Sequence, residues 1–85
     1  MNIGIEKAIK LTRKGKYQAA LHLYNEILER EPSSLEARGH RAWLLRSIGS
    51  YEKALEDYIF IVKHVSGDEE ALFRLGEMYI LLGKK

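Results

Sequence analysis

The sequence predicts an all-α fold of five helices in antiparallel pairs, and three observations point to it. Apolar residues recur with helical rather than strand spacing along most of the chain. The sequence matches itself without a gap when it is shifted by 34 residues. Glycine, proline and serine separate the apolar segments, where helices end and restart. Repetition at this spacing is typical of a solenoid, in which each helix pair packs on the next.

The repeat defines the domain organisation. The shift gives eight identities between the first two units, which are Ala8 with Ala42, Leu11 with Leu45, Gly15 with Gly49, Tyr17 with Tyr51, Ala20 with Ala54, Leu21 with Leu55, Tyr24 with Tyr58 and Ile27 with Ile61. A second shift places Glu36-Ala37 on Glu70-Ala71 and Gly49 on Gly83. We therefore expect one domain over residues 1–85, with repeat 1 at 1–34, repeat 2 at 35–68, and a half repeat or capping helix at 69–85.

Each full repeat divides into two helices, and the third unit supplies one. The expected helices span 3–14, 17–30, 35–48, 51–64 and 69–82. Along 17–30, one broad apolar stripe is formed by Ala20, Leu21, Tyr24, Ile27 and Leu28, and 51–64 repeats it. Gly15 and Gly49 lie between paired helices, where a residue with positive φ ends a helix without Cβ strain.

Capping residues separate the units. Pro32 cannot continue a helix interior, and Ser33 with Glu36 predicts a capping box for the next helix. Asp68 is expected to cap the fifth helix in the same way.

Composition excludes several classes of protein. The chain has no cysteine, so disulfides and thiolate metal sites are excluded. No apolar run is long enough to span a membrane, and the first residues lack the apolar core of a signal peptide. The net charge of +2 is too small to indicate nucleic-acid binding. We expect a cytoplasmic protein with no membrane insertion and no nucleic-acid partner.

The 34-residue unit resembles the tetratricopeptide repeat. The resemblance rests on Gly15, Tyr17, Ala20, Tyr24 and Pro32, and on Gly49, Tyr51, Ala54 and Tyr58. The sequence departs from the family pattern in the second unit, where Arg38 stands at the family's tryptophan position and Arg41 at its leucine position. The resemblance implies a right-handed superhelix without catalytic activity that binds a protein or peptide segment in a concave groove.

The resemblance also implies which residues line that groove, since the first helix of each unit faces it. These positions hold Ile5, Ile9 and Arg13, then Glu36, His40, Trp43 and Arg46, then Phe73, Arg74 and Glu77. One subfamily clamps the C-terminal carboxylates of chaperone peptides at five groove positions, which here hold Ile5, Ile9, His40, Glu70 and Arg74. Only Arg74 fits a clamp of several donors, so we expect no chaperone-tail partner.

An apolar floor with charged edges favours an amphipathic or aromatic-containing partner segment. Trp43 is the expected anchor, because its helical phase is off the Ala42–Leu45 core stripe; the alternative is that Trp43 packs as core. Summed over each helix, charge is +3 along 3–14, +2 along 35–48 and −2 along 69–82. We therefore expect a groove that is basic at its N-terminal end and acidic at its C-terminal end.

Catalytic and metal sites have little support. His22, His40 and His64 lack the i, i+4 spacing of a helical metal site, and His40 near Glu36 has no nucleophile beside it. We expect no metal, no cofactor and no enzymatic activity.

Self-association is the alternative function. The fifth helix is expected to present Leu72, Leu75, Tyr79 and Leu82 where a following helix should cover them. Such an apolar patch usually marks an interface. Either the chain is a piece of a longer array, or a second copy covers this face.

Overall fold

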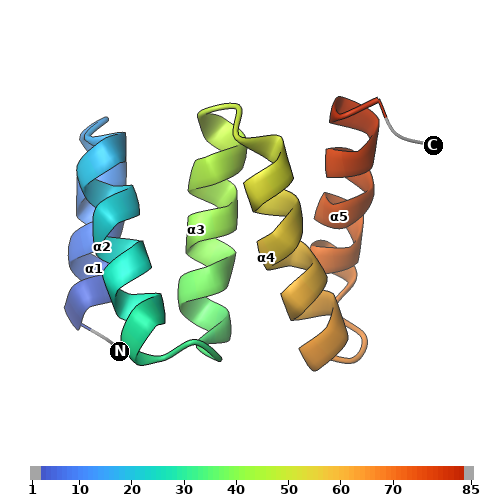
Figure 1. Ribbon diagram of the computed structural model, residues 1–85, viewed down its shortest axis with the longest axis horizontal. Coiled ribbons are helices and arrows are strands. Elements are labelled where there is room, and N and C mark those ends of the chain that lie inside the picture. Colours follow the sequence, from blue (N-terminus) through green and yellow to red (C-terminus); the bar gives the residue numbers. More distant parts are fainter. Residues whose placement is uncertain (1–2, 84–85) are drawn as a thin grey trace.

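The computed structural model describes residues 3–83 and shows helices packed side by side in chain order (Figure 1). Its elements are α1 (Ile3–Arg13), α2 (Tyr17–Arg30), α3 (Leu35–Ser47), α4 (Tyr51–His64) and α5 (Glu69–Leu81). The predicted all-α fold of antiparallel helix pairs is confirmed. Residues 1–2 and 84–85, which the expected domain of 1–85 includes, lie outside the described residues.

Glycine ends the first helix of each unit. Gly15, Gly49 and Gly83 have φ of 78°, 84° and 72°, a region that L side chains rarely adopt. At the end of α1, the Lys16 amide donates to the Leu11 carbonyl at 2.9 Å, the six-residue bond that closes a glycine-terminated helix. Because this turn takes up the residue before each glycine, α1, α3 and α5 end one residue earlier than predicted.

Side chains cap α3 and α5. The Asp68 carboxylate accepts from the Ala71 amide at 2.9 Å, so the predicted cap of the fifth helix is confirmed. The predicted capping box of α3 is wrong. Ser34, rather than Ser33, accepts from the Ala37 amide at 3.2 Å. Ser33 lies in the turn that follows α2, so the cap falls one residue later and no Glu stands at its third position.

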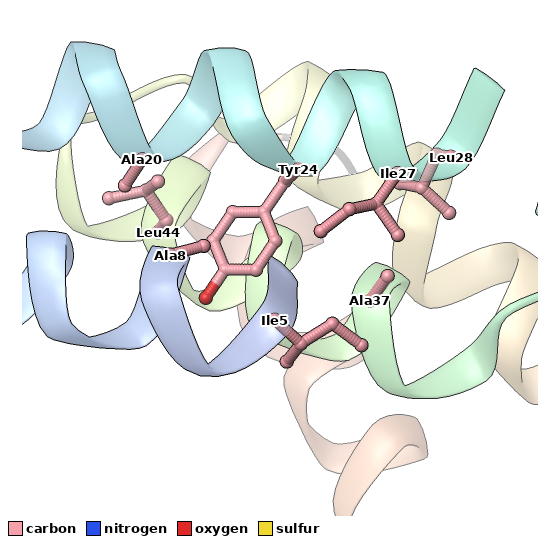
Figure 2. Close-up of a cluster of buried hydrophobic side chains, with 8 residues drawn as sticks. All are labelled: Ile5, Ala8, Ala20, Tyr24, Ile27, Leu28, Ala37 and Leu44. Carbon is pink, nitrogen blue, oxygen red and sulfur yellow. The ribbon is translucent and has the colours of Figure 1, made fainter. Parts of the chain in front are cut away.

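Two apolar clusters form one core along the array. The first joins α1, α2 and α3, and Figure 2 shows Tyr24 pointing from α2 toward α1, near Ala8. Ala8 and Ala20 are fully buried, and such small side chains let α1 and α2 approach closely. The second cluster joins α3, α4 and α5 through Ala42, Leu45, Ala54, Tyr58, Ile61, Ala71 and Met78. Leu21 and Ile48 pack against both clusters, so the core is continuous.

A buried carboxylate interrupts the apolar face of α4. Asp57 is 0% exposed, and among residues 3–83 it is the one charged residue that is buried. Arg41 from α3 donates to it twice, from Nε at 2.8 Å and from Nη2 at 2.6 Å. Arg38, one turn earlier on α3, donates to the same carboxylate at 3.2 Å. The paired charges satisfy an ion that would be very costly to bury alone.

The two arginines extend this contact to α2, to the loop before α3 and to an aromatic ring of α4. Arg41 also donates to the Asn25 side chain of α2 at 2.9 Å, and Arg38 donates to the Pro32 carbonyl at 2.9 Å. The Arg38 guanidinium lies 3.8 Å from the centroid of the Phe60 ring. The Asp57 network, meaning Asp57 with Arg38 and Arg41, therefore fixes α3 against both α2 and α4.

Removal of one partner should expose the cost of this burial. We predict that Arg41→Met lowers the free energy of unfolding by about 3 kcal/mol, because Asp57 stays buried with Arg38 alone. Urea denaturation followed by circular dichroism measures the change. Arg30→Met, at an exposed site on α2, is the matched control and should stay within about 1 kcal/mol of the parent. Equal effects of the two substitutions would contradict the role of the network.

Candidate functional site

A hollow of about 600 Å³ lies between α3 and α5 and reaches α4. We call it the α3–α5 groove. Its lining residues are Leu35, Glu36, Gly39, His40 and Trp43 on the α3 side, Tyr58, Ile61 and Val65 on the α4 side, and Asp68, Glu70, Ala71 and Arg74 on the α5 side. Equivalent helices of successive repeats thus form its two walls, since α3 and α5 are related by the shift of 34 residues.

The base of the groove is apolar. Tyr58, Ile61 and Ala71 are buried members of the second core cluster, and Leu35 and Val65 pack against that cluster. Burial raises the pKa of the Tyr58 phenol above its ordinary value, against the opposing influence of the nearby arginines. The base therefore offers a nonpolar surface that stays uncharged at neutral pH.

Trp43 stands on the α3 wall with 49% of its surface exposed. It is the single tryptophan of the chain, and the structure leaves it outside both core clusters. The side chain therefore combines a large apolar ring with direct access from the groove. Groups of this kind contribute most to binding at many protein interfaces.

An ion pair joins the two walls near Trp43. Arg46 on α3 donates to the Glu77 carboxylate on α5 at 2.8 Å, and Arg74 donates to the same oxygen at 3.3 Å. The hydrogen bond from Arg46 lowers the pKa of Glu77, and the hydrogen bond to Glu77 raises the pKa of Arg46. Arg46 and Glu77, both predicted groove residues, thus bridge the walls and do not line the hollow.

Four of the ten predicted groove residues line the α3–α5 groove together. These are Glu36, His40, Trp43 and Arg74, which come from α3 and α5. The repeat register places them on facing walls, because equivalent positions of successive first helices point the same way. Glu70, one of the five groove positions that the chaperone-binding subfamily uses as a clamp, also lines this groove.

The first unit does not contribute as predicted. Ile5 is 1% exposed and belongs to the first core cluster, so its expected place on an open groove floor is wrong (Figure 2). Ile9 is half-buried against the same cluster, and Arg13 is exposed but away from the hollow. The α1 helix contacts α3 directly, and this contact covers Ile5.

Phe73 occupies the position in α5 that Ile5 occupies in α1, yet it is 65% exposed and lies off the hollow. Gly39, at the same position in α3, is half-buried. A Cβ added to Gly39 would lie 3.8 Å from Ile61 on α4, and Ile5 shares its core cluster with residues of α2 and α3. Burial at this register therefore depends on the helices that follow, and α5 has none after it within residues 3–83.

The positive charge expected along α3 does not reach the α3–α5 groove. Arg38 and Arg41 supply most of the positive charge of α3, and both point into the Asp57 network. Neither lines the groove. Arg46, the third arginine of α3, is paired with Glu77. The second repeat therefore adds no unpaired guanidinium to the groove, and its free charges there are acidic.

The Asp57 network was not predicted from the sequence, although two signals in the sequence indicate it. Asp57 is a carboxylate beside the apolar stripe of α4, next to Tyr58. Arg38 and Arg41 replace large apolar residues of the repeat pattern, at i and i+3 on one helix face. Charged residues on one face of each of two packed helices indicate an ion pair between them.

The outer face of α5 is open in the described chain. Leu72 and Tyr79 are 58% and 39% exposed, while Leu75 and Leu82 are half-buried. A Cβ added to Gly76 would meet no neighbouring helix within 4 Å, whereas its equivalents Ala8 and Ala42 are fully buried. The face that packs on a partner helix in the full repeats is therefore uncovered in α5.

Comparison with known proteins identifies the family. A family model described as "Tetratricopeptide repeat" matches residues 5–59. The chain belongs to the tetratricopeptide repeat family. It is 29% identical over 65 residues to ER membrane protein complex subunit 2-A of Xenopus laevis and, over the same length, to ER membrane protein complex subunit 2 of Xenopus tropicalis. Each match covers 76% of this chain but 22% of the relative, so the chain spans about a fifth of their length.

Membership of the tetratricopeptide repeat family sets the general role. Modules of this family generally mediate protein–protein interactions and are typically non-catalytic. Among residues 3–83, no helix is both long and apolar enough to cross a membrane. The cytoplasmic location expected from the sequence stays a prediction, since the similar proteins are named as subunits of an ER membrane complex.

The ion pair between the groove walls predicts an acid-sensitive stability. Because Arg46 lowers the folded-state pKa of Glu77 below its ordinary value of 4.5, ionised Glu77 stabilises the fold above that value. This stabilisation is lost as the pH falls through the lower, folded-state pKa. We predict that Glu77→Gln lowers the melting temperature at neutral pH. We also predict that the melting temperature of the variant falls less than that of the parent between neutral and acidic pH. Thermal melts across that range test this, and parallel curves for the two proteins would contradict it.

Proposed function

We propose that the chain binds a segment of another protein in the α3–α5 groove, with Trp43 as the apolar anchor. The observation that carries the proposal is the half-exposed Trp43 beside a hollow of about 600 Å³ with a nonpolar base. Pockets of this volume with an apolar base and a few polar groups are typical binding sites. The predicted groove residues Ile5, Ile9 and Arg13 play no direct part in this contact.

The wall contacts support a preformed site. Arg46 and Glu77 join α3 to α5, and the Asp57 network holds α3 on α4. A groove whose walls are fixed before binding loses less conformational entropy when it takes up a partner. The groove needs no metal or cofactor for this role.

The curated relatives favour a protein partner. Their names describe subunits of an ER membrane protein complex, which are proteins that assemble with others. By this similarity, we propose that the present chain also serves inside a multi-protein assembly, as an adaptor module.

Trp43→Ala tests the proposal. We expect this variant to keep its helical content and melting temperature, because the residue is half-exposed and outside the core clusters. We expect its affinity for captured partners to fall at least about tenfold, as loss of an aromatic anchor does. Circular dichroism measures the helical content and the melting temperature. Affinity capture followed by titration of the captured protein measures the affinity.

Phe73→Ala is the matched control, since Phe73 is an exposed aromatic residue outside the hollow. It should bind like the parent. A folded Trp43→Ala protein with unchanged partner affinity would overturn the groove as the binding site.

Self-association is a second candidate function, favoured by the open face of α5. Leu72 and Tyr79 are exposed there, and Leu75 and Leu82 lie half-buried beside them. Five of the eight exposed large apolar residues of the described chain belong to α5, which are Leu72, Phe73, Tyr79, Ile80 and Leu81. A second copy that packed on this face would remove them from water.

Sedimentation equilibrium tests this candidate. If α5 mediates pairing, the average mass should rise with protein concentration, and Leu72→Glu should hold the chain monomeric at every concentration. Glu substitution at exposed Ala19 on α2 is the control and should leave the mass curve unchanged. A parent chain that stays monomeric up to millimolar concentration would exclude pairing.

A further inference from the structure

The groove is lined by more acidic than basic groups. Glu36, Asp68 and Glu70 contribute three carboxylates, and Arg74 contributes the one guanidinium. The lining therefore has a net of two negative charges, although the whole chain is positive by two. This local reversal of sign separates the groove from the rest of the surface.

The basic groups around the groove are already engaged. Arg74 donates to Glu77 at 3.3 Å, and Arg46 donates to the same carboxylate at 2.8 Å. Arg38 and Arg41 are held at Asp57. A partner carboxylate or phosphate would have to compete with these contacts, so the groove is poorly suited to an anion.

Two of the acidic groups at the opposite end are available. Glu36 and Glu70 line the hollow, and neither forms an ion pair with another residue of the described chain. They hold equivalent positions in the first turns of α3 and α5, and Asp68 lies beside Glu70. All three face the end of the groove away from the Arg46–Glu77 bridge, since α3 and α5 run parallel (Figure 1).

From this arrangement we propose that the groove selects a basic amphipathic segment: a large apolar side chain packs on Trp43, and lysine or arginine nearby meets Glu36 and Glu70. The inference rests on the proposed function and specifies its partner chemistry. Charge complementarity supports this proposal, because the unpaired charged groups that line the groove are carboxylates. The nonpolar base beside Trp43 accounts for the apolar half of the segment.

Both acidic residues also favour helix formation, because carboxylates in a first turn offset the helix dipole. That effect explains why an acidic residue is tolerated at each position. It does not require the carboxylates to face a shared hollow, as Glu36 and Glu70 do. The test therefore compares them with acidic residues outside the groove.

The experiment selects binders from a random peptide display library and measures their affinities by titration of the Trp43 emission. Because the chain has one tryptophan, selected peptides without tryptophan give a signal from the groove alone. We expect enrichment of lysine or arginine within a few residues of a large apolar residue. We expect the double variant Glu36→Gln, Glu70→Gln to bind these peptides roughly tenfold more weakly at low salt, with a smaller difference at high salt.

The double variant Glu52→Gln, Glu56→Gln is the matched control, since both residues are exposed on α4 and outside the groove. It should bind like the parent. Peptides that change the Trp43 emission but show no excess of basic residues, or bind all three proteins equally, overturn this inference and leave groove binding intact. A selection whose peptides all leave the Trp43 emission unchanged overturns groove binding and this inference together.

Discussion

The burial of one carboxylate constrains the whole arrangement. Asp57 is fully buried on α4, and it is stable there because Arg38 and Arg41 of α3 donate to its two oxygens. Apolar packing alone tolerates small shifts of one helix along another, whereas a bidentate arginine–carboxylate pair accepts a narrow range of geometries. Since Arg41 also donates to Asn25, the same pair sets the position of α3 between both neighbouring helices.

The same constraint decides the chemistry of the groove. Arg38 and Arg41 pair with Asp57 and do not line the groove, and Arg46 pairs with Glu77. What remains toward the hollow is apolar surface, Trp43 and the carboxylates of the first turns. A basic chain thus presents an acidic groove because the arginines of α3 are paired with carboxylates of α4 and α5. In the proposed binding mode, these side chains therefore affect both stability and the choice of partner.

The sequence predicted the elements well, because helical periodicity and glycine positions are local properties. The repeat register also placed Glu36, His40, Trp43 and Arg74 together, since equivalent positions of stacked helices point the same way. It failed for Ile5 because burial at that position depends on whether the following helices cover it. The charge sum over α3 did not predict the charge of the groove, because such a sum treats every charge as solvent-facing. The direction in which Arg38 points depends on Asp57, which is 19 residues away in sequence.

A double-mutant cycle between Asp57 and Arg41 tests the central claim most directly. The free energies of unfolding of Asp57→Asn, Arg41→Gln and the double variant give the coupling between the two side chains. If the pair fixes α3 on α4, the coupling should reach at least about 1.5 kcal/mol, because each single change strands a buried or half-buried partner. Coupling within about 0.3 kcal/mol of zero, as for independent sites, would contradict the account.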